Sequence, residues 1–248
     1  MKETMNIVEA NIDNLLSFWQ QAAKPFGYCF ESDNLNYCYV ENSDWPNRLW
    51  FRQEITEESA EAAKDQIHSN SKNLVVPYWD IDKSASCQIL ERAGFTERSL
   101  LIGMSFKLQE RSKKQLNLKF ARVLSTEQAK VWAEVYPKAF GYRISEELPT
   151  KSYKDIEFYL ASYQGEPVGT AMVYQTNDVI GVYGVGVIPE RRRMGFAEEI
   201  MEFVLNRAAT LEASYIILQA SVMGKGLYDK LGFKEDFTIK NYILNQDI

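Results

Sequence analysis

The sequence predicts an α+β (α/β layered) fold, a mixed central β-sheet flanked by helices, in two similar domains in tandem. The first observation is that strand and helix patterns alternate through residues 118–244, which is typical of a sheet covered by helices. The second is a helix that ends in Gly-Phe and leads into a strand, which occurs at Gly94–Phe95 and again at Gly232–Phe233. This repetition favours two copies of one architecture.

A polar stretch separates the two halves. Residues 109–117 are the most polar segment between two well-patterned regions, and we expect them to form a linker. The predicted domains are therefore residues 1–114 and 115–248. The first domain ends in the same order as the second, with the apolar run 74–79, a helix, and a strand at 99–108.

The second half provides a signal for each of its elements. β-branched and alternating patterns predict the strands, and apolar residues at helical spacing predict the helices. Ser125 is the expected N-cap of the helix at residues 126–140. A hairpin turn is expected at residues 164–167. The expected strands cover residues 118–124, 156–163, 168–174, 179–188 and 215–219, with terminal strands in 233–244, and the expected helices cover 126–140, 197–211 and 225–230.

Composition excludes several classes of function. Hydrophobic residues make up 46% of the 248-residue chain and its formal net charge is −6, so we expect a packed core and neither a nucleic-acid nor a membrane partner. No apolar run is long enough for a membrane span, and the N-terminus lacks a secretory pattern. Three cysteines and one histidine favour a reduced, cytoplasmic protein with neither a metal site nor a histidine-based triad.

The junction between the strand at 179–188 and the next helix is the most informative segment. A helix N-terminus leaves backbone N–H groups without internal partners, and these groups attract an anion. Gly195 and the small Ala197 let an anion approach. The loop lacks the Gly-Lys-Ser/Thr of a nucleotide triphosphate site and the three glycines of a dinucleotide fingerprint.

Two motifs here resemble those of the GNAT N-acetyltransferase superfamily. The pattern Pro189-x-x-Arg192-x-x-Gly195-x-Ala197 after an apolar strand is similar to that superfamily's acetyl-CoA-binding motif. About thirty residues later, residues 227–233 resemble its C-terminal motif. The first half contains no such loop, so it looks like a degenerate copy of the same unit.

The resemblance implies a role for each matching residue. The backbone of the strand would bind the pantetheine arm of coenzyme A, with Gly184 and Gly186 easing its approach, and the loop would surround the pyrophosphate mainly with N–H groups. Tyr228 matches the tyrosine that protonates or hydrogen-bonds the departing thiolate. Ser221 stands where many members have asparagine. The implied cofactor-binding residues are Val185, Gly186, Val187, Arg192, Arg193, Met194, Gly195, Phe196, Ala197 and Ser221.

The function that the resemblance implies is transfer of an acetyl group from acetyl-CoA to a primary amine of a small molecule or peptide. The amine would attack directly in a ternary complex, and its proton needs a base or a water relay. Tyr183, Glu157, Asp178 and Glu198 are the open candidates for the base. A non-catalytic acyl-CoA sensor is the alternative, and an aminoacyl-tRNA-dependent transferase is less favoured because the chain is acidic.

Overall fold

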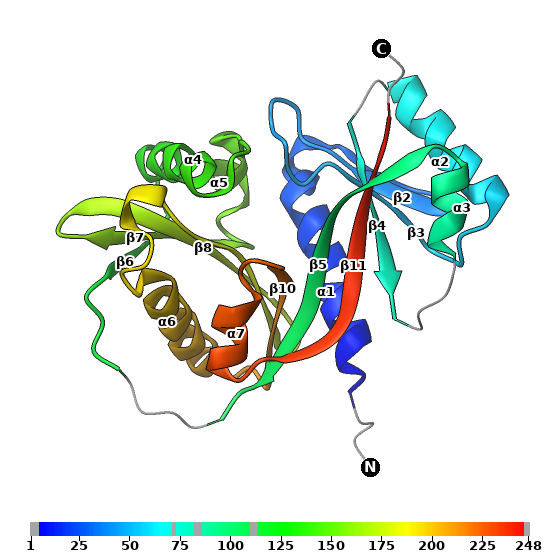
Figure 1. Ribbon diagram of the computed structural model, residues 1–248. Helices are drawn as coiled ribbons and strands as arrows, with labels where there is room; N and C mark the ends of the chain where they lie inside the picture. The colour runs from blue at the N-terminus through cyan, green and yellow to red at the C-terminus, as the bar shows by residue number, and fades with distance from the viewer. Residues whose placement is uncertain (1–4, 71–72, 82–85, 110–113, 246–248) are drawn as a thin grey trace.

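The computed structural model describes residues 5–70, 73–81, 86–109 and 114–245. One mixed sheet runs through the molecule in the order β1-β2-β3-β4-β11-β5-β10-β9-β8-β7-β6 (Figure 1). Its strands are β1 (Cys29–Glu31), β2 (Leu35–Cys38), β3 (Arg48–Phe51), β4 (Val75–Asp80), β5 (Phe95–Lys107), β6 (Lys119–Arg122), β7 (Glu157–Tyr163), β8 (Glu166–Thr176), β9 (Val179–Val187), β10 (Tyr215–Ser221) and β11 (Lys234–Leu244). The helices are α1 (Ile7–Ala23), α2 (Glu57–Asn70), α3 (Cys87–Arg92), α4 (Thr126–Phe140), α5 (Glu147–Ser152), α6 (Phe196–Thr210) and α7 (Lys225–Leu231), with short 3₁₀ helices η1 (Lys24–Phe26) and η2 (Pro189–Arg191).

The local predictions for the second half are confirmed except in its terminal region. Helix α4 begins after Ser125, whose hydroxyl oxygen accepts the N–H of Gln128 at 3.3 Å, as a capping residue does. The terminal region is one strand, β11, rather than several, and a bulge between Glu235 and Phe237 interrupts its register. Residues 110–113 of the expected linker lie outside the described residues.

The last strands of the two halves exchange places. β5 and β11 pair antiparallel along most of their length, β11 also pairs with β4, and β5 also pairs with β10. The final strand of the chain therefore lies between two strands of the first half, and β5 lies between two strands of the second (Figure 1). The division into domains 1–114 and 115–248 stays a prediction, and this pairing joins the two segments in one sheet.

Helices cover the second-half strands on both faces (Figure 1). α6 packs on β8 and β9 through a core that includes Ile200, Met201 and Val204. α1 and α4 contribute to a different core, in which Phe18 of α1 stacks on Tyr183 of β9 with ring centroids 3.9 Å apart. The first helix of the chain is thus packed against the second half at β9.

Within the described residues no helix is both long and apolar enough to cross a membrane, and no three His, Cys, Asp or Glu side chains gather as metal ligands would. Cys29, Cys38 and Cys87 are all free thiols.

Candidate active site

The sheet opens between β9 and β10. These parallel strands pair at three positions, which end at Ile217 opposite Gly181. Beyond this point β10 stays paired with β5 as far as Ser221, and β9 stays paired with β8. Residues 182–187 therefore present an edge of β9 that no described strand covers. Such an edge offers backbone N–H and C=O groups to an extended ligand, which then pairs like an added strand.

The backbone of Val187 faces this open edge. The N–H of Ile188 donates to the carbonyl of Val168 on β8 at 2.9 Å, and successive residues of a strand direct their polar groups to opposite edges. The Thr170 hydroxyl donates to the carbonyl of Gly184 at 2.9 Å, which turns Gly184 toward β8 as well. Val185, like Val187, is therefore directed to the open edge, as the resemblance implies.

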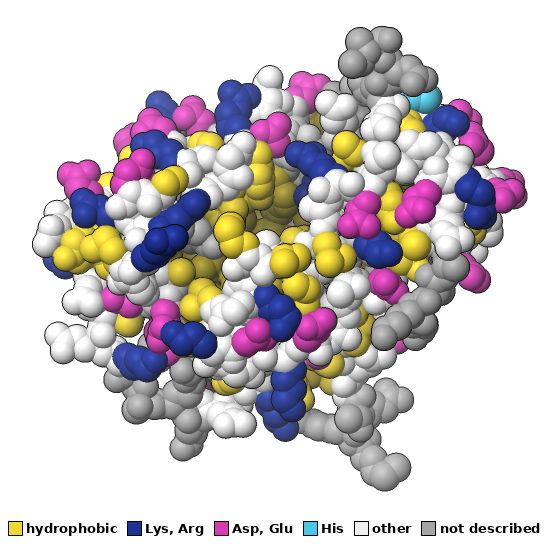
Figure 2. All heavy atoms as spheres, viewed as in Figure 1, with side chains coloured by type: hydrophobic (Ala, Val, Ile, Leu, Met, Phe, Trp, Pro, Cys, Tyr) yellow, Lys and Arg dark blue, Asp and Glu magenta, His cyan; other side chains and the backbone are white. Residues whose placement is uncertain are grey.

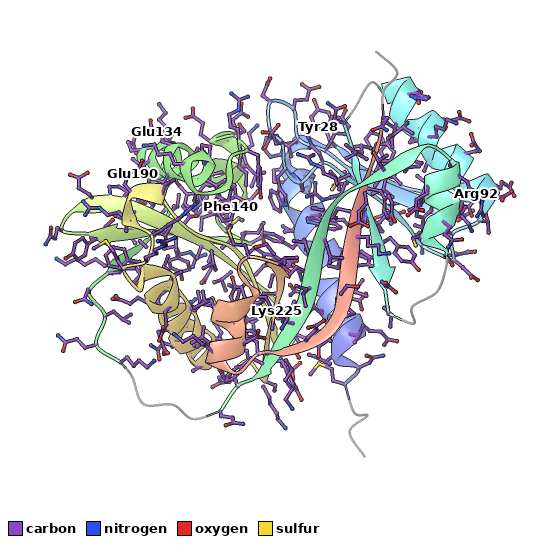
Figure 3. The ribbon with its side chains drawn as sticks, viewed as in Figure 1. Tyr28, Arg92, Glu134, Phe140, Glu190 and Lys225 are labelled. Atoms are coloured by element: carbon purple, nitrogen blue, oxygen red, sulfur yellow. The ribbon has the colours of Figure 1, made fainter. Side chains whose placement is uncertain are left out.

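Two glycines of β9 make room for α4 rather than for a ligand. A register shift between Thr170 and Met172 marks a bulge in the β8–β9 pairing, and Gly184 has a φ of +55° there. A Cβ on Gly186 would lie 2.5 Å from the Phe140 ring, and one on Gly184 would lie 3.0 Å from the Tyr136 ring. Figure 3 labels Phe140 at the end of α4. The expectation that these glycines ease the cofactor's approach needs this correction, because their missing side chains accommodate aromatic rings.

The loop before α6 exposes unpaired N–H groups. Arg193 and Gly195 both have left-handed backbone conformations, with φ values of +62° and +80°. Gly195 is the N-cap and provides no side-chain hydrogen bond to the helix. Phe196 anchors the first turn, because its ring is buried and packs against Tyr163 at a centroid distance of 4.9 Å. The first turn of α6 therefore keeps N–H groups available for an anion.

The predicted loop residues differ in what their side chains do. Arg192 turns back onto the protein, since its Nε donates to the Val187 carbonyl at 3.2 Å and its Nη2 donates to the Ala139 carbonyl at 2.9 Å. It thereby ties the loop to the end of α4. Arg193 and Met194 are exposed, and Ala197 is half-buried. Arg192 is thus placed to hold the loop in shape, and its backbone N–H is also occupied, because it donates to the Pro189 carbonyl at 3.3 Å.

Tyr228 lies beside the end of β10. Its ring packs edge-on against Phe233 at 5.8 Å, and it stands 3.8 Å from where a Cβ on Gly224 would be. The Ser221 hydroxyl accepts the Gly224 N–H at 3.1 Å, so this serine shapes the turn into α7. Burial raises the pKa of Tyr228 to about 12. The phenol is therefore protonated at neutral pH and can donate a hydrogen bond.

The candidates for the base do not stand free at the opening. Tyr183 is buried and donates to Asn14 Oδ1 at 2.5 Å. Glu157 accepts from Arg207, Arg122 and Tyr159. Although burial raises the pKa of this carboxyl, those hydrogen bonds and charges outweigh it and hold the pKa below its ordinary value. Glu157 is a structural ion-pair centre.

The other two carboxylates are also poorly placed. Asp178 lies in the turn before β9, at the end where β9 and β10 are paired. Glu198 forms ion pairs with Lys114 at 3.6 Å and with Lys230 at 3.8 Å. None of the four candidates is singled out as the base by its position.

A polar network that the sequence interpretation missed supports β9. Asn14 of α1 also donates to the Tyr174 carbonyl and to the Thr176 hydroxyl, and Asn11 accepts from Gln219 of β10 at 2.7 Å. Both asparagines are fully buried. The signal in the sequence was a pair of asparagines inside the apolar pattern of residues 7–23, a position that buried hydrogen bonds must explain.

Comparisons with known proteins agree with this geometry. Residues 124–233 match the family model described as "Acetyltransferase (GNAT) family". A GCN5-related N-acetyltransferase from Kribbella flavida has a TM-score of 0.71 at 16% identity, covering 96% of this chain and 97% of that chain. A GCN5-related N-acetyltransferase from Sphaerobacter thermophilus has a TM-score of 0.67 at 16% identity, and the match covers 96% of this chain and 93% of that chain.

A more distant structure is the glucosamine N-acetyltransferase region of a fungal multi-domain GH3 β-N-acetylglucosaminidase. It has a TM-score of 0.61 at 11% identity and covers 84% of this chain and 31% of that chain. No curated protein matches the sequence. At these identities the structural matches establish a shared fold, and two of them cover both halves. The chain has the fold of these N-acetyltransferase structures, and its residues 124–233 match the acetyltransferase (GNAT) family model.

Proposed function

We propose that this protein transfers the acetyl group of acetyl-CoA to a primary amine, by direct attack within a ternary complex. The observation that carries the proposal is the open edge of β9 leading directly into a loop with two left-handed residues and an uncapped helix. The edge suits the amide-bearing pantetheine arm. The loop suits the pyrophosphate, which the backbone N–H groups and the α6 dipole would stabilise.

The proposed contacts follow the chain from the strand to the helix. The pantetheine amides pair with the backbone of Val185 and Val187. The pyrophosphate lies against the N–H groups of residues 193–197. Because Arg192 already fixes the loop to α4, the loop is formed before the ligand arrives, and less conformational entropy is lost on binding.

The chemistry requires one bond to form and one to break. The amine nitrogen attacks the thioester carbonyl carbon, and the C–S bond breaks as the tetrahedral intermediate collapses. The β9 N–H near Val187 would stabilise the negative charge on the carbonyl oxygen. The amine loses a proton to water, and the sulfur leaves as a thiolate that accepts a hydrogen bond from Tyr228.

The pKa of Tyr228 decides whether this side chain protonates the leaving thiolate or only donates a hydrogen bond to it. A phenol with a pKa of about 12 is a weaker acid than an ordinary thiol, whose pKa is about 8.5. Full proton transfer to the thiolate would be uphill by roughly 5 kcal/mol at 1.36 kcal/mol per pKa unit. Tyr228 therefore stabilises the leaving thiolate mainly as a hydrogen-bond donor, and the thiolate acquires its proton from solvent.

The test is release of the coenzyme A thiol in the presence of acetyl-CoA and a panel of primary amines. We expect release above the rate of hydrolysis with at least one amine, together with a higher melting temperature on addition of acetyl-CoA. A raised melting temperature without thiol release for any amine would identify a sensor instead. No effect of acetyl-CoA on either quantity would refute the binding site as well.

A further inference from the structure

A large polar cavity lies between the two halves, beside the opening of the sheet. Its volume is about 860 Å³, which is within the range of small-molecule sites. The first half provides most of its wall, through residues 39–48 and the β5 segment 98–101, and Gly141 and Tyr142 close it from the second half. Figure 2 shows the surface hollowed between the regions of α4 and β5.

The cavity adjoins both strands of the opening. Tyr142 on its wall shares a hydrogen bond with Tyr136, and the Tyr136 ring packs over Gly184 in the bulge of β9. On the other side, Leu101 of the wall is paired with Ser221 at the end of β10. The cavity wall is therefore separated from β9 by the Tyr136 side chain and from the end of β10 by one strand pairing.

Arg48 brings a buried positive charge to this cavity. Its Nη1 donates to the carbonyls of Pro46 and Asn47, each at 3.0 Å, and its guanidinium lies 5.5 Å from the Trp19 ring centroid. Its Nε is buried without a hydrogen-bond partner. Within the described part of the chain, no carboxylate forms an ion pair with it. A buried charge without a counter-ion is costly.

A second arginine lies near the first. Burial lowers the pKa of Arg48, and the positive charge of Arg98 lowers it further. Arg98 lines the same cavity from β5, where the register against β11 is shifted. Among the described residues it too forms no ion pair. Two neighbouring guanidinium groups without carboxylates form a site for an anion, and the planar fork of arginine suits a carboxylate.

The acidic residues of the cavity do not cancel this charge. Glu41 and Asp44 both lie at exposed positions on the wall, where solvent screens them more than it screens Arg48. The Asp44 Oδ2 accepts the backbone N–H of Arg143 at 2.7 Å, which holds this carboxylate at the rim. The Arg48 end of the cavity is therefore positive, and the exposed Arg98 shares the rim with Glu41 and Asp44.

We propose that the acceptor is an amine that also carries a carboxylate, as an amino acid or a short peptide does, and that Arg48 and Arg98 bind the carboxylate. This inference rests on the proposed acetyl transfer for the role of the cavity as the acceptor site. It gives the first half of the chain a specific task, which is to select the acceptor. The amine end then lies toward the opening between β9 and β10.

The experiment compares amino acids and dipeptides with their own C-terminal carboxamides. For wild type we measure kcat/KM for acetylation and, in the presence of coenzyme A, the binding of each compound by calorimetry. We expect at least one acid to be favoured over its carboxamide by about tenfold or more, as the loss of charged hydrogen bonds predicts. Glucosamine serves for comparison as an amine that carries no carboxylate.

The variants locate the preference. R98Q changes an exposed residue and should remove most of the preference for the acid while acetyl-CoA affinity stays unchanged. R48K keeps the charge but loses the fork, and it should weaken the preference. R52Q is the matched control, because Arg52 is an exposed arginine of the first half that donates to the Ser32 carbonyl outside the cavity. It should leave the preference intact.

The outcomes separate the two proposals. Equal kcat/KM and equal binding for every acid and its carboxamide overturn the carboxylate site, even if neutral amines are acetylated and the proposed function stands. A preference that persists in R98Q and R48K also overturns it. If acids bind through Arg98 but no amine is acetylated, the anion site is supported and the acetyl transfer is refuted.

Discussion

Replacing Gly195 by alanine is the sharpest perturbation of the loop. Gly195 has a φ of +80°, and a Cβ there would meet no atom within 4 Å. The cost in stability is therefore backbone strain alone, about 1 kcal/mol for an L-residue in the left-handed region. For a chain of this size we expect the melting temperature to fall by roughly 2–4 °C.

The cost for binding is larger. The methyl group would enter the open space beside the N–H groups of residues 195–197, and relief of the strain would turn these N–H groups. Each hydrogen bond to a charged phosphate contributes about 1.5–3 kcal/mol, so the loss of one raises the Kd for acetyl-CoA by roughly tenfold or more. Titration calorimetry measures this Kd.

A matched control separates strain from binding. Gly165, in the hairpin turn between β7 and β8, has a φ of +90° and likewise has no atom within 4 Å of its Cβ position. Gly165→Ala should lower the melting temperature by a similar amount and leave the Kd unchanged. If Gly195→Ala and Gly165→Ala have the same Kd as wild type, the pyrophosphate does not bind at this loop.

Three further substitutions test the roles of individual side chains. Tyr228→Phe should lower kcat by about 10- to 100-fold, because one hydrogen bond to a charged group is lost, and it should leave acetyl-CoA affinity unchanged. The control Tyr215→Phe, at the other end of β10, should keep wild-type kcat. Equal kcat in both variants would show that Tyr228 takes no part in the reaction. Tyr183→Phe should lower stability by about 1–3 kcal/mol, because it leaves the buried Asn14 oxygen without a donor, and should not alter kcat; a large loss of kcat would contradict the packing role. Glu157→Gln should cost about 3 kcal/mol in chemical denaturation, because it breaks a buried charge cluster, and should keep kcat/KM. The folded-state pKa of Glu157 is depressed, so the wild-type stability from this carboxylate is present above its ordinary value of 4.5 and is lost as pH falls through the lower folded value; an identical acid-denaturation profile for Glu157→Gln and wild type would contradict this.

Local sequence patterns predicted most elements of the second half of the fold. The boundaries of α4, with Ser125 as its cap, and the order from β9 through the loop to α6 follow from apolar periodicity and from the placement of Pro189 and Gly195. These features depend on neighbours in sequence, so a single sequence reveals them.

Features that depend on distant contacts were not predictable in the same way. The exchange of β5 and β11 requires knowledge of which strands pair, and antiparallel pairing of two strands far apart in the sequence leaves no local mark. The burial of Tyr183 depends on Phe18 and Asn14 of the first helix. The glycines of β9 suggested ligand access, but only the α4 rings explain Gly186.

The candidate site also contains features that depend on sequence neighbours and features that depend on distant contacts. The backbone ligands and Tyr228 were identifiable from two motifs, because motif spacing reflects a local strand–loop–helix geometry. The acceptor cavity was not, because Arg48, Arg98 and Tyr142 are brought together by the pairing of the two halves. Nothing in the pattern around these residues marks them as neighbours.

The central claim is that the open edge of β9 and the following loop bind acetyl-CoA. A crystal structure of the protein with acetyl-CoA tests it most directly. We predict that the pantetheine amides pair with the backbone of Val185 and Val187, that the pyrophosphate contacts the N–H groups of residues 193–197, and that the thioester sulfur lies within hydrogen-bond reach of the Tyr228 hydroxyl. A pyrophosphate bound away from this loop, or a thioester outside the opening between β9 and β10, would contradict the account.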